Sequence, residues 1–95
     1  MYNKTMKFEW DQAKSIANKI KHGMDFIEAK DLWLDGDRVE IHLPYPAESR
    51  FILIAKLNNE HWTAVYTMRS ENIRLISVRR SREKEVALYG KEENS

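Results

Sequence analysis

The sequence contains no cysteine and little glycine or proline. Without cysteine there is no disulfide, no thiolate zinc site and no thiol nucleophile, so the fold depends on burial alone. Three isolated glycines cannot form a glycine-rich phosphate loop, and no Gly-x-Ser-x-Gly elbow surrounds a serine. His22, His42 and His61 are about 20 residues apart and form no i, i+4 pair. We therefore expect neither a metal site nor a cofactor.

Long apolar runs are also absent. No run approaches the ~18 residues that span a bilayer, and the first residues lack the apolar segment of a signal peptide. We expect a cytoplasmic protein without membrane association. A chain of 95 residues with 42% hydrophobic and 11% aromatic residues suits one core, so residues 1–95 are predicted to form a single domain.

Charge is divided along the chain, although the formal net charge is only +1. Residues 24–48 hold seven acids against Lys30 and Arg38, whereas residues 69–84 hold five arginines and Lys84 against Glu71 and Glu83. Guanidinium groups match phosphate oxygens well, so this cluster favours an anionic partner. Solvated arginines that pair with the acidic middle would explain the same pattern.

Two helices are predicted near the N-terminus. Asp11 is suited to cap a helix over residues 12–22, and Gly23 is suited to end it. The apolar residues of this helix recur at three and four and are expected to face the core: Ala13, Ile16, Ala17 and Ile20. A second helix begins at Asp25, forms a capping box with Glu28 and runs to Trp33. We expect the two to form a hairpin.

Alternating apolar residues predict strands around these helices. The predicted strands cover residues 8–10, 38–43 (an edge strand), 50–57 (an interior strand), 61–68 and 73–80. Asn58 and Asn59 suit a type I′ turn, and Ser81 is expected to open a last helix through Gly90. The predicted fold class is α+β: an antiparallel sheet of a four-stranded meander plus a short N-terminal strand, two N-terminal helices and one C-terminal helix.

The last strand carries arginine near both ends. Strict alternation puts Ile73, Leu75, Ser77 and Arg79 on one face and Arg74, Ile76, Val78 and Arg80 on the other. Arg50 and Arg69 also lie near strand ends, so several guanidiniums could converge on one rim. Alternatively, these arginines mark solvent rims, or Arg79 or Arg80 forms a structural ion pair with Glu48 or Glu85.

Four aromatic residues offer rings on which an unpaired base could stack. They are Tyr45, Tyr66, Tyr89 and Trp62. Rings of this kind are more often part of the core, so the pattern favours stacking only weakly.

An ordered series of short segments runs through the chain. It comprises Phe8-Glu9-Trp10-Asp11, Lys14, Asn18, Lys21-His22-Gly23, Phe26, Glu28-Ala29, Glu48-x-Arg50, Val65-Tyr66-Thr67-x-Arg69, Ile73-Arg74-Leu75-Ile76-Ser77-x-Arg79, Glu85 and Tyr89. Over residues 8 to 89 this series resembles the BrnT family of toxins. The departures are Val78 and Ser81 in place of alanine and Ala55 in place of glycine, and none removes a polar group.

The resemblance implies a RelE-like fold and an endoribonuclease that shuts down translation. It also implies a BrnA-type antitoxin with a ribbon-helix-helix domain, through which alone the complex contacts operator DNA. A heterotetramer of two toxins and two antitoxins is the assembly that the family suggests.

Metal-independent RNA cleavage by a 2′-hydroxyl needs a base, an acid and cations for the extra charge on phosphorus. Arginine suits the last role, and the candidate catalytic residues are Arg79, Arg69, Arg50, Glu85, His22 and Tyr89, with Glu48 a further candidate for proton transfer. The candidate RNA-binding residues are Arg74, Arg80, Lys21 and Arg82. His22, at a helix end, also suits a purely structural role.

Two other functions fit the same sequence. A noncatalytic nucleic-acid-binding module would use the arginines for salt-dependent affinity without cleavage. A protein-interaction domain would use the acidic stretch, residues 25–48, to receive a basic partner.

Overall fold

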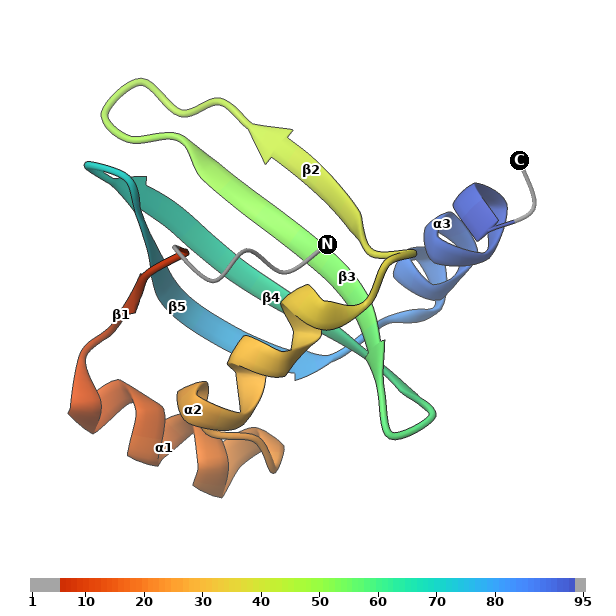
Figure 1. Ribbon diagram of the computed structural model, residues 1–95, viewed down its shortest axis with the longest axis horizontal. Coiled ribbons are helices and arrows are strands. Elements are labelled where there is room, and N and C mark those ends of the chain that lie inside the picture. The colour runs from red at the N-terminus through yellow and green to blue at the C-terminus, as the bar shows by residue number, and fades with distance from the viewer. Residues whose placement is uncertain (1–5, 94–95) are drawn as a thin grey trace.

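The computed structural model describes residues 6–93. Its elements follow in the order β1 (Phe8–Glu9), α1 (Gln12–His22), α2 (Phe26–Ala29), η1 (Lys30–Leu34), β2 (Val39–Leu43), β3 (Arg50–Leu57), β4 (Glu60–Arg69), β5 (Asn72–Arg80) and α3 (Glu83–Glu93) (Figure 1). The predicted α+β class is confirmed. The second predicted helix is α-helical only in its first half, because η1 continues it as a 3₁₀ helix. No helix within residues 6–93 is long and apolar enough to cross a membrane.

The five strands form one sheet in the order β1-β5-β4-β3-β2. Strands β2 to β5 are the predicted antiparallel meander, with β2 at an edge and β3 inside. Asn58 and Asn59, between β3 and β4, have φ of 51° and 68°, as a type I′ turn requires. The expectation of a wholly antiparallel sheet is wrong, because β1 pairs in parallel with β5.

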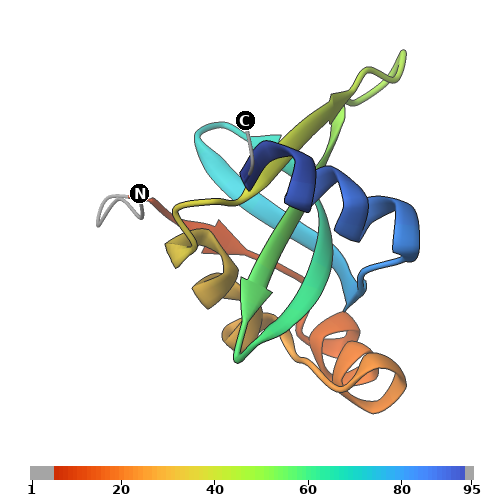
Figure 2. The ribbon, with the colours of Figure 1, turned by 90° about the vertical axis from the view of Figure 1, so that its right-hand side faces the viewer.

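The main core lies between one side of the sheet and the α2–η1 segment. Phe26, Leu32 and Trp33 are almost completely buried against strand residues such as Leu53. The Trp33 ring meets Tyr66 edge to face at 5.2 Å. Burial of each large side chain of this kind contributes about 1.5–3 kcal/mol. Helix α3 packs on the opposite side of the sheet, as Figure 2 shows.

The apolar side of α1 faces outward, so the prediction that it packs on the core is wrong. Ile16 is 55% exposed and Ile20 is 82% exposed, whereas Ser15 and Asn18 are buried. The helix bounds and its Asp11 cap are nevertheless as predicted. Periodicity therefore identifies the helix but misidentifies its buried side.

Polar contacts explain this orientation of α1. The Asn18 side chain donates to the Val78 carbonyl at 2.8 Å and accepts from the Val78 N–H at 3.2 Å. Because β1 pairs with β5 only at Ile73 and Arg74, Asn18 replaces a neighbouring strand farther along β5. The Ser15 hydroxyl accepts a hydrogen bond from the backbone N–H at the start of α2.

Candidate functional site

A β-bulge in β5 decides which arginines share a face of the sheet. Val65 of β4 pairs with Ser77, but the next residue, Tyr66, pairs with Leu75. Ile76 is therefore left without a partner in β4, and the alternation of β5 shifts by one residue. As a result Val78, not Ser77, follows Leu75 into the core.

The bulge overturns the predicted faces of β5. Arg74 and Arg79, which strict alternation separates, lie on the same face because they pair with Thr67 and Thr63. Arg80 lies on the core side instead. Its guanidinium is 2.7 Å from Glu60 and stacks 5.5 Å from the centre of the Trp62 ring.

The side of the sheet opposite α2 and η1 thus carries Arg50, Arg69, Arg74 and Arg79, and we call it the arginine face. These four predicted site residues from three strands share one face, but Arg79 pairs with Thr63 near the start of β4, whereas Arg69 ends that strand. Helix α3 covers the part of this face near Arg79. The part around Arg50 is open and forms a depression.

Arg79 is the most tightly held of the four. Its two terminal nitrogens donate to the two carboxylate oxygens of Glu85, both at 2.8 Å. Glu85 also accepts from the Thr63 hydroxyl and from the backbone N–H of Arg82. Its bonds to Arg79, above all, lower the pKa of Glu85 to about 2, and the same pair raises the pKa of Arg79. This is the structural ion pair that the sequence left open, and so low a pKa makes Glu85 a weak base.

The start of α3 differs from its prediction in one respect. Ser81 does not cap the helix, which begins at Glu83. The Ser81 hydroxyl shares a 2.8 Å hydrogen bond with Thr63, whose own proton goes to Glu85. Ser81 therefore supports the Arg79–Glu85 pair.

Arg74 and Arg69 have looser carboxylate partners. Glu9 accepts from Arg74 at 2.9 Å and from Asn72 at 3.1 Å, and these bonds lower the pKa of Glu9. The sequence could not assign this role to Glu9, because it depends on the parallel pairing of β1 with β5. Arg69 lies 3.4 Å from Glu48, and both side chains are more than a third exposed.

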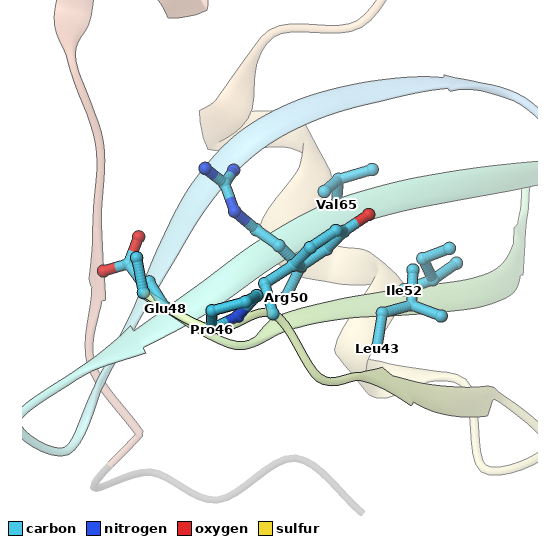
Figure 3. A pocket seen from close by; sticks show the side chains of 8 residues that line it. Leu43, Pro46, Glu48, Arg50, Ile52 and Val65 are labelled. Carbon is cyan, nitrogen blue, oxygen red and sulfur yellow. The ribbon is translucent and has the colours of Figure 1, made fainter.

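Arg50 has no carboxylate partner among residues 6–93. It lines the depression, which has a volume of about 850 Å³. The other lining residues are Leu43, Tyr45, Pro46, Ala47, Glu48, Ile52 and Val65. Figure 3 shows Glu48 and the Arg50 guanidinium toward one end and Leu43 with Ile52 toward the other. An available cation beside apolar walls suits an unpaired nucleotide, which has both a phosphate and a flat base.

Among the four predicted stacking rings, Tyr45 alone is exposed, at 55%, and it lines the depression. Trp62 and Tyr66 belong to the main core. Tyr89 belongs to α3 and is buried, and its hydroxyl donates to Asp35 at 2.8 Å. The alternative that most of these rings are structural is therefore confirmed.

The remaining predicted residues lie away from the depression. Lys21 and His22 end α1, and in the described part of the chain no hydrogen bond or ion pair links them to the arginine face. Arg82 precedes α3 and is exposed. Within residues 6–93, no three histidine, aspartate or glutamate side chains are grouped to hold a metal ion.

Comparison with known proteins adds one result. A family model matches residues 10–85, and that family is described as the ribonuclease toxin, BrnT, of type II toxin-antitoxin systems. No curated protein matches the chain significantly.

Proposed function

The chain belongs to the BrnT family of ribonuclease toxins of type II toxin-antitoxin systems, and on this basis we propose that its arginine face binds and cleaves RNA. We assign it a RelE-like fold and a metal-independent endoribonuclease activity that inhibits translation in the cytoplasm. The observation that carries the proposal is that the bulge at Ile76 puts Arg79 on the same face as Arg74, so that four arginines share the face on which the depression around Arg50 is open.

The proposed reaction starts with attack of a ribose 2′-oxygen on the adjacent phosphorus. The O2′–P bond forms as the P–O5′ bond breaks, so a base takes the 2′ proton and an acid supplies one to the leaving 5′-oxygen. Extra negative charge develops on the phosphate oxygens at the transition state. Arg50, which pairs with no carboxylate among residues 6–93, and Arg69 are the cations best placed to stabilise this charge, because fixed donors in a partly apolar site act strongly.

Among the carboxylates, Glu48 is the best candidate for the base. It lines the depression together with Arg50 and makes only a loose, exposed contact with Arg69. Glu85 is less suitable because four hydrogen bonds already occupy it. We assign Glu85 the role of positioning Arg79, and Tyr89 a structural role on the buried side of α3.

The assignments of phosphate contacts follow from the same geometry. Arg74 and Arg79 retain N–H donors beyond those that their carboxylates use, so they can bind phosphates on either side of the cleaved bond. Arg80, on the core side, has no part in this proposal.

The type II toxin-antitoxin family implies a protein antitoxin as the partner of this chain. We propose that this antitoxin is a BrnA-type ribbon-helix-helix protein and that the complex contains two toxins and two antitoxins.

The test is digestion of single-stranded RNA by purified protein in EDTA. Arg50→Ala is expected to lower the cleavage rate by about 10²- to 10³-fold, the usual effect of removing one transition-state donor. Arg80→Ala removes the same charge from the other side of the sheet and should leave the rate nearly unchanged. Both variants should unfold close to the wild-type temperature.

Two results would contradict the proposal. If wild-type protein binds RNA but leaves it intact in EDTA, the noncatalytic binding module is the better description. If Arg50→Ala and Arg80→Ala behave alike, the arginine face is not the site of cleavage.

A further inference from the structure

The outward side of α1 carries an apolar stripe, formed by Ala13, Ile16, Ala17 and Ile20. Their spacing of i, i+3, i+4 and i+7 places all four on one side of the helix, at about 100° per residue. All four are exposed, and Ile20 is 82% exposed. The buried residues Ser15 and Asn18 lie on the opposite side.

This α1 stripe contributes little to the fold. The helix is held in place because Ser15 accepts a hydrogen bond from the α2 backbone and Asn18 exchanges two hydrogen bonds with the β5 backbone. Scattered exposed apolar residues are ordinary on protein surfaces, but a continuous stripe along two turns is typical of a helix that binds another helix.

The charges beside the stripe indicate what kind of surface it can meet. Lys14 and Lys21 lie along one side of it and Lys19 along the other, and α1 contains no acidic residue. Lys19 bonds Glu28 of α2 at 2.8 Å, whereas Lys14 and Lys21 make no ion pair among the described residues. A second copy of α1 would place lysines opposite lysines, which disfavours a homodimer through this surface.

We propose that the α1 stripe is a docking site for an acidic amphipathic helix of the antitoxin. The apolar side of that helix would cover Ile16 and Ile20, and its acidic residues would pair with Lys14 and Lys21. The inference rests on the proposed function, because it assumes that this toxin has an antitoxin. The stripe contains no residue of the arginine face, so docking there and RNA cleavage use separate surfaces.

The experiment measures binding of the full-length toxin to the full-length antitoxin from the same operon, by calorimetry and without RNA. Ile20→Glu places a carboxylate where the acidic helix would dock and is expected to weaken binding by at least about 100-fold. Leu88→Glu, at a 42% exposed leucine of α3, is the matched control and should bind as wild type does. Both variants should cleave free RNA at the wild-type rate.

A second variant tests the charges alone. Lys14→Glu with Lys21→Glu should weaken binding by about 10-fold or more, and added salt should narrow the difference from wild type. Ile20→Leu keeps the apolar contact and should bind nearly as well as wild type.

The inference is overturned if Ile20→Glu binds the antitoxin as tightly as wild type does. It is also overturned if that variant abolishes toxin self-association, measured by sedimentation, and leaves antitoxin binding intact. Failure of the proposed function would appear differently, as intact RNA in the digestion assay with wild-type protein.

Discussion

The two faces of the sheet are built by the same strands and stabilised in different ways. On the core face, alternate residues such as Leu53 and Val78 lose all contact with water against α2 and η1. On the arginine face, each paired guanidinium meets a carboxylate from outside the central strands: Glu9 from β1, Glu48 from the loop before β3, and Glu85 from α3. The core face therefore depends on buried area, whereas the arginine face, although it buries Ile54, depends also on the placement of peripheral elements.

Pairing on the arginine face loosens toward the depression. Under α3, the side chains of Arg79 and Glu85 are 22% and 16% exposed, whereas those of Arg69 and Glu48 are 54% and 37% exposed. Arg50 in the depression has no carboxylate partner in the described residues. The cations most available to an incoming phosphate are thus the ones that contribute least to stability.

The largest expected effect on stability comes from truncating one side chain on each face of the sheet, at neighbouring positions of β3. Leu53→Ala opens a cavity in the core and should lower the free energy of unfolding by about 3–5 kcal/mol. Ile52 is half-buried on the arginine face and borders the depression, so Ile52→Ala should cost less than half as much. Urea unfolding monitored by tryptophan fluorescence measures both, and equal losses would show that the faces do not differ in this way.

The next effect tests whether polar contacts hold α1. Asn18→Ala leaves the N–H and carbonyl of Val78 and the carbonyl of Met24 without their partner, and should cost about 2–3 kcal/mol. Ile16→Ala removes more apolar atoms from the exposed side of the same helix and should change stability by less than about 0.5 kcal/mol. Thermal unfolding of the two variants measures both losses of stability. A larger loss for Ile16→Ala than for Asn18→Ala would mean that the apolar side of α1 packs against the protein.

Local features of the fold could be predicted from sequence, and features that depend on distant partners could not. Asp11, the Asp25–Glu28 box and the Asn58–Asn59 turn act within a few residues, so their patterns identified the correct elements. The side on which α1 is buried depends on Asn18 and Val78, which are 60 residues apart. The sequence trace of the bulge is a change of phase in the apolar pattern between Leu75 and Ile76, which strict alternation does not reproduce and no glycine marks.

In the candidate site too, local sequence features could be predicted and contacts between distant residues could not. The resemblance over residues 8 to 89 pointed to the family whose model matches residues 10–85, because ordered short segments are visible in sequence. The positions of Arg50 and Arg69 near strand ends predicted that arginines from different strands could share one rim, but strict alternation wrongly separated Arg74 from Arg79. Which of these arginines remain available to bind phosphate could not be predicted from sequence, because Glu9 and Glu85 reach the face only through the placement of β1 and α3.

The smallest effect concerns pH and the pair under α3. Glu85 has a pKa of about 2 in the folded protein against a usual 4.5, so the unfolded chain takes up a proton first on acidification. The stabilisation by Glu85 is therefore complete above about pH 4.5 and declines as the pH falls toward 2. Between pH 7 and pH 3 this contributes about 1–2 kcal/mol to the loss of unfolding free energy.

Glu85→Gln should remove the contribution of Glu85 to the pH dependence of the unfolding free energy and leave the contributions of other groups unchanged. Arg79→Lys keeps the charge but replaces the two-pronged contact with a single ammonium, so it should retain a smaller pH-dependent loss. Urea unfolding of the three proteins at pH 7, 4 and 3 measures the difference. If Glu85→Gln loses as much stability on acidification as wild type, the Arg79–Glu85 pair does not fix Arg79 as strongly as its geometry indicates. Arg79 would then be more available to bind phosphate than its contact with Glu85 indicates, and the arginine face would have one more open cation beside Arg50.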